Sequence, residues 1–162
     1  MMSYNFKNDN GRINQGRPGL NVLIPPTDPL FNTQVESGVQ NCVFALGCKG
    51  YITLGSCEGH PPEADPTNDT YWHISIAYDS DRVFEVFQRA MKWSFVYVKH
   101  DSTYPADLDW FNRVFEQRFN QFNILTIYTS SNTVKRNQLA KRCFAKHCLA
   151  RINKLPLASQ IT

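Results

Sequence analysis

Long apolar segments are missing from this chain of 162 residues. No apolar run approaches the roughly 20 residues that a membrane-spanning helix needs. Residues 1–19 also lack the apolar centre of a secretory signal. These absences argue against a helical membrane protein, and we expect a soluble, cytoplasmic protein with no membrane partner.

Acidic residues are missing from the C-terminal third, after Glu116. The formal net charge is +3, and eight lysines and arginines follow Glu116, which leaves −5 for the first 116 residues. Basic charge is therefore concentrated at one end of the chain, where it favours contact with a phosphate backbone or an acidic protein.

A fully paired set of disulfides is excluded, because the chain has five cysteines. Four of them lie among helix-like apolar positions, where buried reduced thiols are common. We expect reduced thiols at Cys42, Cys48, Cys143 and Cys148.

The composition is that of a folded protein, with 42% hydrophobic and 13% aromatic residues. A chain of this length is sufficient for one core and one domain. We expect a flexible N-terminal arm over 1–19, a single globular domain over 20–155 and a C-terminal tail over 156–162.

Apolar periodicity predicts alternating helices and strands. Thr33, three residues before Glu36, resembles a capping box, and Ser80 is a good helix cap. The elements predict an α/β (α+β) fold, a mixed sheet of four to five strands packed with about four helices. The expected helices cover 32–47, 80–92, 107–122 and 130–155, and the expected strands cover 51–55, 71–78, 93–100 and 123–129, with an edge strand within 20–31.

The stretch GSCEGHPPEAD (55–65) places Cys57 and His60 at the spacing of a metal-binding knuckle. His73 on the adjoining strand would be a third ligand. Structural zinc sites normally use two such pairs, so we assign no metal from the sequence. A carboxylate from Glu58, Glu63 or Asp65 would complete a site of this kind.

The same stretch has three other interpretations. Cys57 with His60 as its base would form a catalytic pair, although no third orienting residue is visible. A turn that only ends a strand is the plain alternative. We favour a ligand-cradling turn, because Ser56 to Gly59 follow a strand and Gly59 permits a positive φ that turns backbone N–H groups toward a ligand.

GYITLGSCEGH, followed by HISIAY and WSFVYVKH, resembles the Thr-x-x-Ser-Cys-x-Gly-basic signature of the wybutosine-synthesising tRNA methyltransferase family (third-step protein). The resemblance covers about residues 50–100. The matching positions are Thr53, Ser56, Cys57 and Gly59, and His60 stands where that family usually has arginine.

The resemblance implies a small α/β fold with an S-adenosylmethionine site beside a tRNA base. If the protein is an enzyme, we expect an S-adenosylmethionine-dependent methyltransferase, with Cys57 and His60 as its catalytic candidates. The Ser-Cys-Glu-Gly-His turn also resembles turns in small uncharacterised proteins of phages and mobile elements. The expected cofactor-binding residues are Thr53, Ser56, Cys57, Gly59 and His100.

The expected C-terminal helix carries the basic charge, and one side of it would contact nucleic acid. Tyr128 and the aromatic residues of 93–100 would stack bases if they are exposed. A solvated face and an acidic protein partner are the alternatives. The candidate nucleic-acid contacts are Lys135, Arg136, Lys141, Arg142, Lys146 and Arg151.

Two functional hypotheses follow. The first is a protein that binds RNA of tRNA type or a nucleotide-like ligand at the Ser56 to His60 turn and resembles a tRNA-modifying methyltransferase. The second is a non-enzymatic interaction or inhibitor protein of phage or mobile-element type, which binds a host protein or nucleic-acid complex through its basic helix.

Overall fold

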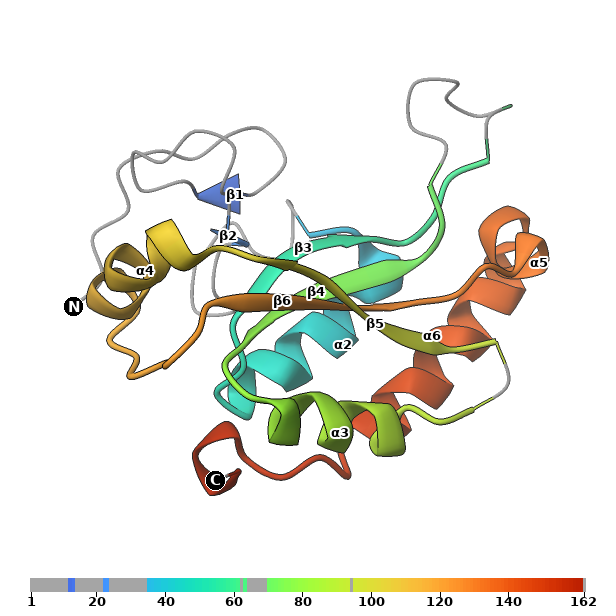
Figure 1. The fold of residues 1–162 in the computed structure, drawn as a ribbon. Helices are drawn as coiled ribbons and strands as arrows, with labels where there is room; N and C mark the ends of the chain where they lie inside the picture. Colours follow the sequence, from blue (N-terminus) through green and yellow to red (C-terminus); the bar gives the residue numbers. More distant parts are fainter. Residues whose placement is uncertain are drawn as a thin grey trace.

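The centre of the molecule is a four-stranded antiparallel sheet (Figure 1). The computed structural model describes residues 12–13, 22–23, 35–61, 63, 70–93 and 95–161. Within them the strand order is β3-β4-β6-β5. The strands are β3 (Thr53–Cys57), β4 (His73–Tyr78), β5 (Tyr97–Thr103) and β6 (Asn123–Tyr128).

Helices cover the two faces of this sheet unequally. α2 (Ser37–Cys48), α3 (Asp81–Ala90) and α6 (Gln138–Ile152) pack on one face around the main core. α4 (Leu108–Val114) packs on part of the other face through a smaller aromatic cluster. The remaining elements are β1 (Arg12–Ile13), β2 (Val22–Leu23), η1 (Pro105–Asp107), α5 (Asn132–Arg136) and η2 (Ala158–Gln160).

Alternation along the central strands determines which side chains enter the main core. Ile74 and Ile76 of β4 point into it and are fully buried, as the sequence predicts. Ser75 between them points to the opposite face, where its hydroxyl meets Thr126 of β6. The period-2 pattern therefore gives each strand one apolar and one more polar side.

The predicted α+β class with a single domain is confirmed, but the sheet of named strands is antiparallel rather than mixed. β4, α3 and β5 form a crossover unit in which the two strands run the same way. They do not pair, because β6 lies between them and is antiparallel to both.

Two predicted helices are shorter than expected. The 130–155 helix is divided at Asn137, which leaves helical geometry and caps α6 by accepting a hydrogen bond from the Ala140 N–H at 3.0 Å. Of the predicted 107–122 helix, only α4 forms, and it ends at Val114. Glu116 follows with φ +54°, which lies outside helical geometry. Among the described residues, no helix has the length and apolarity needed to cross a bilayer.

The remaining predicted segments have different outcomes. The expected tail packs on the domain, since the Tyr51 hydroxyl donates to the Pro156 carbonyl at 2.7 Å and the Ala158 N–H to Lys49 at 2.8 Å. The predicted strand over 93–100 begins only at Tyr97. The expected arm and most of 20–31 lie outside the described residues.

Candidate functional site

The turn after β3 depends on Gly59. Its φ is +89°, and a Cβ there would lie 3.0 Å from the Trp72 nitrogen. His60 then pairs with Thr70, whose carbonyl accepts the His60 N–H at 2.8 Å. A larger residue at position 59 would be strained and crowded, so glycine is the residue that this turn requires.

Glu36 joins the turn from the start of α2. Its Oε2 lies 2.6 Å from His60 Nε2, and its Oε1 accepts the Glu58 N–H at 3.1 Å. The predicted capping box is wrong on this point, because Glu36 is the N-cap residue itself and its side chain caps nothing in the helix. Its carboxylate instead holds the 57–60 turn.

Cys57 lies at the base of the turn and is 7% exposed. Its Sγ lies 2.9 Å from Thr70 Oγ1 and accepts the Gly59 N–H at 3.4 Å. Burial raises the pKa of the thiol, the negative charge of Glu36 adds to this, and the Thr70 and Gly59 hydrogen bonds oppose it. The protonated thiol is favoured, which weakens the interpretation of Cys57 as a thiolate nucleophile.

Lys141 of α6 forms a hydrogen bond to the backbone of the 57–60 turn. Its side chain is 5% exposed and its Nζ donates to the Gly59 carbonyl at 2.7 Å. Lys141 therefore contacts the turn and is not on the expected nucleic-acid surface.

The other five expected nucleic-acid residues have different environments. Lys135 is also 5% exposed, with its Nζ 4.3 Å from the centre of the Tyr71 ring. Arg136 is exposed and forms an ion pair with Glu63 at 2.7 Å. Arg151 donates to a backbone carbonyl of α3, and Arg142 and Lys146 point into solvent.

The structure does not gather the expected cofactor-binding residues in one place. Ser56 and Gly59 lie at the turn, but Thr53 is buried at the opposite end of β3. His100 lies on β5, the other edge strand, where its Nδ1 is 2.6 Å from the Tyr78 hydroxyl. His73 is not part of the group formed by Glu36, Cys57 and His60, and its Nδ1 lies 2.9 Å from the Tyr71 carbonyl.

A second group of side chains lies on β5 and β6, on the face of the sheet that α4 covers only in part. The Tyr97 and Tyr128 rings are 5.4 Å apart with planes inclined by 32°, and Tyr97 is 49% exposed. Lys99 places its ammonium 5.1 Å from the centre of the Tyr128 ring. We call Tyr97, Lys99 and Tyr128 the aromatic platform.

Polar side chains continue this face away from the platform. The Thr126 hydroxyl donates to Asp101 Oδ2 at 2.6 Å, so the Ser75 hydroxyl, 2.8 Å from Thr126, donates to it in turn. Lys99 lies 3.9 Å from the same carboxylate. The aromatic platform therefore borders a row of ordered hydrogen-bonding groups.

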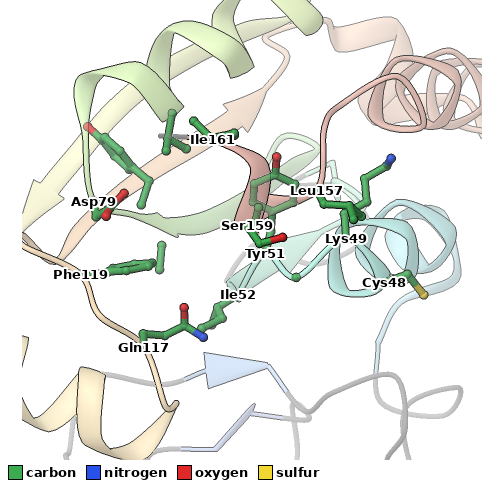
Figure 2. A pocket seen from close by; sticks show the side chains of 15 residues that line it. Cys48, Lys49, Tyr51, Ile52, Asp79, Gln117, Phe119, Leu157, Ser159 and Ile161 are labelled. Carbon is green, nitrogen blue, oxygen red and sulfur yellow. The ribbon is translucent and has the colours of Figure 1, made fainter.

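Among the hollows on the surface of the described residues, two have linings that bear on the candidate sites. One of about 570 Å³ adjoins the platform and includes Trp93, Tyr97 and Tyr128 in its lining. The other, of about 420 Å³, lies near the start of β3, away from the 57–60 turn. Figure 2 shows Tyr51, Ile52 and Phe119 around the second hollow together with Leu157 and Ile161 of the C-terminal segment.

Comparison with protein-family models, with curated proteins and with solved structures finds no match to this chain. The chemistry of the site itself is therefore the basis for its function. Sequence reasoning missed Glu36, because its position before a helix looked like that of a capping residue. S-adenosylmethionine binding stays a prediction.

Proposed function

We propose that the protein binds single-stranded RNA on the aromatic platform. The observation that carries this proposal is the pairing of Tyr97 with Tyr128 beside Lys99 on the partly open sheet face. Exposed aromatic rings stack bases, and neighbouring lysines attract the phosphates. The main alternative is a cross-strand aromatic pair that only stabilises the sheet.

The surroundings of the platform support a nucleic-acid ligand. The adjoining hollow of about 570 Å³ also includes Lys92, which is exposed. Phe95, at the tip of the turn before β5, is 62% exposed and has φ +76°. A bulky side chain held at a positive φ is strained, and such strain is concentrated at functional positions.

The basic helix approaches the same region. Trp93 packs against His147 of α6, with ring centres 4.8 Å apart, and Arg151 lies 5.8 Å from the Trp93 ring centre. The exposed Lys146 belongs to the same helix. The basic helix and the aromatic strand, which are far apart in the sequence, are thus linked through Trp93, which lines the same hollow as Tyr97 and Tyr128.

RNA rather than another polyanion is supported by the resemblance of residues 50–100 to a tRNA-modifying family. That resemblance places a ligand at the 56–60 turn, whereas the proposal places the bases on the opposite edge of the sheet. Methyl transfer is a separate prediction, which calorimetric titration of the protein with S-adenosylmethionine tests.

Fluorescence anisotropy with a labelled single-stranded RNA of low sequence complexity tests the proposal. Each stacked base is worth about 1 to 3 kcal/mol, so Tyr97→Ala and Tyr128→Ala should each weaken binding by about 5- to 150-fold. Lys99→Gln should reduce the slope of the logarithm of the binding constant against the logarithm of the salt concentration by about one. Tyr97→Phe should retain binding.

Phe44→Ala is the matched control, because Phe44 is also 49% exposed but lies on α2. It should leave RNA affinity unchanged. No RNA binding at low salt, or full affinity of Tyr97→Ala, would contradict the proposal. Loss of RNA binding together with capture of an acidic protein would instead support the interaction-protein hypothesis.

A further inference from the structure

We propose that Glu36, Cys57 and His60 form a zinc site, independent of RNA binding. The three residues come from the start of α2, the end of β3 and the turn after it. One ligand atom from each, a carboxylate oxygen, a thiol sulfur and an imidazole nitrogen, all lie within 4.8 Å of one another. The site therefore exists only in the folded chain.

The spacing is close to what a tetrahedral zinc ion needs. With Zn–S near 2.3 Å and Zn–N or Zn–O near 2.0 to 2.1 Å, neighbouring ligand atoms lie roughly 3.3 to 3.6 Å apart. The His60 Nε2 to Glu36 Oε2 distance is 2.6 Å, so these two atoms would separate by about an ångström. Rotation of the Glu36 side chain, which is 35% exposed, would open this distance, and the Cys57 sulfur already lies within 4.8 Å of both atoms.

The chemistry of the ligands selects the metal. A thiolate is too soft for magnesium or calcium, which take oxygen ligands, and one cysteine is too few for an iron–sulfur cluster. Thiolate, imidazole and carboxylate together suit Zn²⁺, and two anionic ligands would balance its charge. Binding would release the Cys57 proton to solvent as the thiol becomes a thiolate ligand.

Hydrogen bonds already orient two of the ligands. The Gly59 N–H points to Cys57 Sγ at 3.4 Å, as a donor that stabilises a thiolate would. The Glu58 N–H holds Glu36 Oε1 at 3.1 Å and leaves Oε2 directed at His60. These outer contacts fix ligand direction, and such contacts strengthen metal affinity.

The site has an entrance and an open position. Cys57 is buried, whereas the side chains of His60 and Glu36 are 24% and 35% exposed, so an ion can reach the ligands from solvent. Three protein ligands leave the fourth tetrahedral position for water, the arrangement that lets zinc activate water or bind an oxygen donor.

Titration of the full chain with Co²⁺, a spectroscopic substitute for zinc, tests the site. We expect one equivalent to produce a thiolate-to-cobalt charge-transfer band and the visible bands of tetrahedral Co²⁺, and Zn²⁺ to displace it. Cys57→Ser should remove the charge-transfer band. His60→Gln and Glu36→Gln should weaken affinity by at least about 10- to 100-fold.

Two variants control for nearby residues of the same type. Cys143→Ser removes an exposed cysteine of α6, and His73→Gln removes the histidine that the sequence offered as a ligand; both should keep the spectrum. Absence of the charge-transfer band in the unaltered protein overturns the proposal even if a variant fails to fold. Persistence of the band in folded Cys57→Ser, or its loss in folded His73→Gln, overturns it as well.

Discussion

The ammonium group of Lys141 donates a hydrogen bond to the carbonyl of Gly59 at 2.7 Å, although the two residues are 82 positions apart. This contact joins α6 to the turn after β3 and makes the most basic segment of the chain part of the candidate site. A lysine that the sequence offers as a phosphate ligand is instead part of the scaffold, because its side chain is almost completely buried.

Lys141→Met should destabilise the protein. The variant keeps most of the side-chain volume but leaves the buried Gly59 carbonyl without its donor, at a cost of about 1 to 3 kcal/mol. Urea unfolding followed by circular dichroism measures the change. Lys146→Met, an exposed position on the same helix, should stay within about 0.5 kcal/mol of the parent. Equal stability of both variants would show that the Lys141 contact contributes nothing.

Phe95→Gly should stabilise the fold and weaken RNA binding. Glycine relieves the positive φ, worth about 1 to 2 kcal/mol, and removes an aromatic side chain that is 62% exposed and lies two residues before Tyr97 of the platform. Thermal unfolding and anisotropy on the same preparation measure the two effects.

Glu116→Gly is the matched control for Phe95→Gly, because Glu116 also has a positive φ, +54°. It should leave RNA affinity unchanged. Unchanged RNA affinity in Phe95→Gly would exclude Phe95 from the binding surface.

Gly38→Ala should disturb the 57–60 turn from α2. A Cβ at position 38 would lie 2.5 Å from Glu58 Oε2 and 2.6 Å from Glu58 Cβ, so Glu58 must move. Crowding of this kind costs about 1 to 3 kcal/mol. Unfolding measurements on Gly38→Ala, Glu58→Gly and the double variant test the clash. The double variant should recover stability relative to Gly38→Ala, and strictly additive losses would argue against it.

Thiol labelling should divide the five cysteines into two classes. Cys48 and Cys143 are exposed and should react first. Burial raises the pKa of Cys42 to about 12 and raises those of Cys57 and Cys148 as well. These three thiols should react only after unfolding. Mass spectrometry of peptides after brief alkylation identifies the cysteines that react quickly. Rapid alkylation of Cys57 in the folded protein would contradict its burial at the base of the turn.

The 57–60 turn and the aromatic platform lie at opposite ends of one row of paired residues in the sheet. Cys57 pairs with His73, His73 with Tyr128 and Tyr128 with Tyr97. Three strand spacings of about 4.8 Å place Cys57 and Tyr97 roughly 14 Å apart at opposite edges. RNA on the platform and zinc at the turn can therefore be tested separately by variants at each edge.

Local pattern was sufficient for the parts of the fold that depend on neighbours in sequence. Ser80 was predicted as a cap and accepts the Val83 N–H at 3.4 Å. The alternation that buries Ile74 and Ile76 was equally readable, because a half-buried strand repeats every two residues. The break at Asn137 was not predicted, because the residues on both sides of it have a helical composition. Asn137 is both the C-cap residue of α5 and the N-cap residue of α6.

The sequence by itself determined the α+β class, the buried faces of the central strands and the glycine turn, because these follow from periodicity and backbone geometry. Only the tertiary structure decided that Glu36 reaches His60, that Lys141 lies beneath Gly59, and that β6 separates β4 from β5. Contacts of this kind join residues far apart in the chain, and they depend on how helices pack on the sheet, which no local spacing encodes.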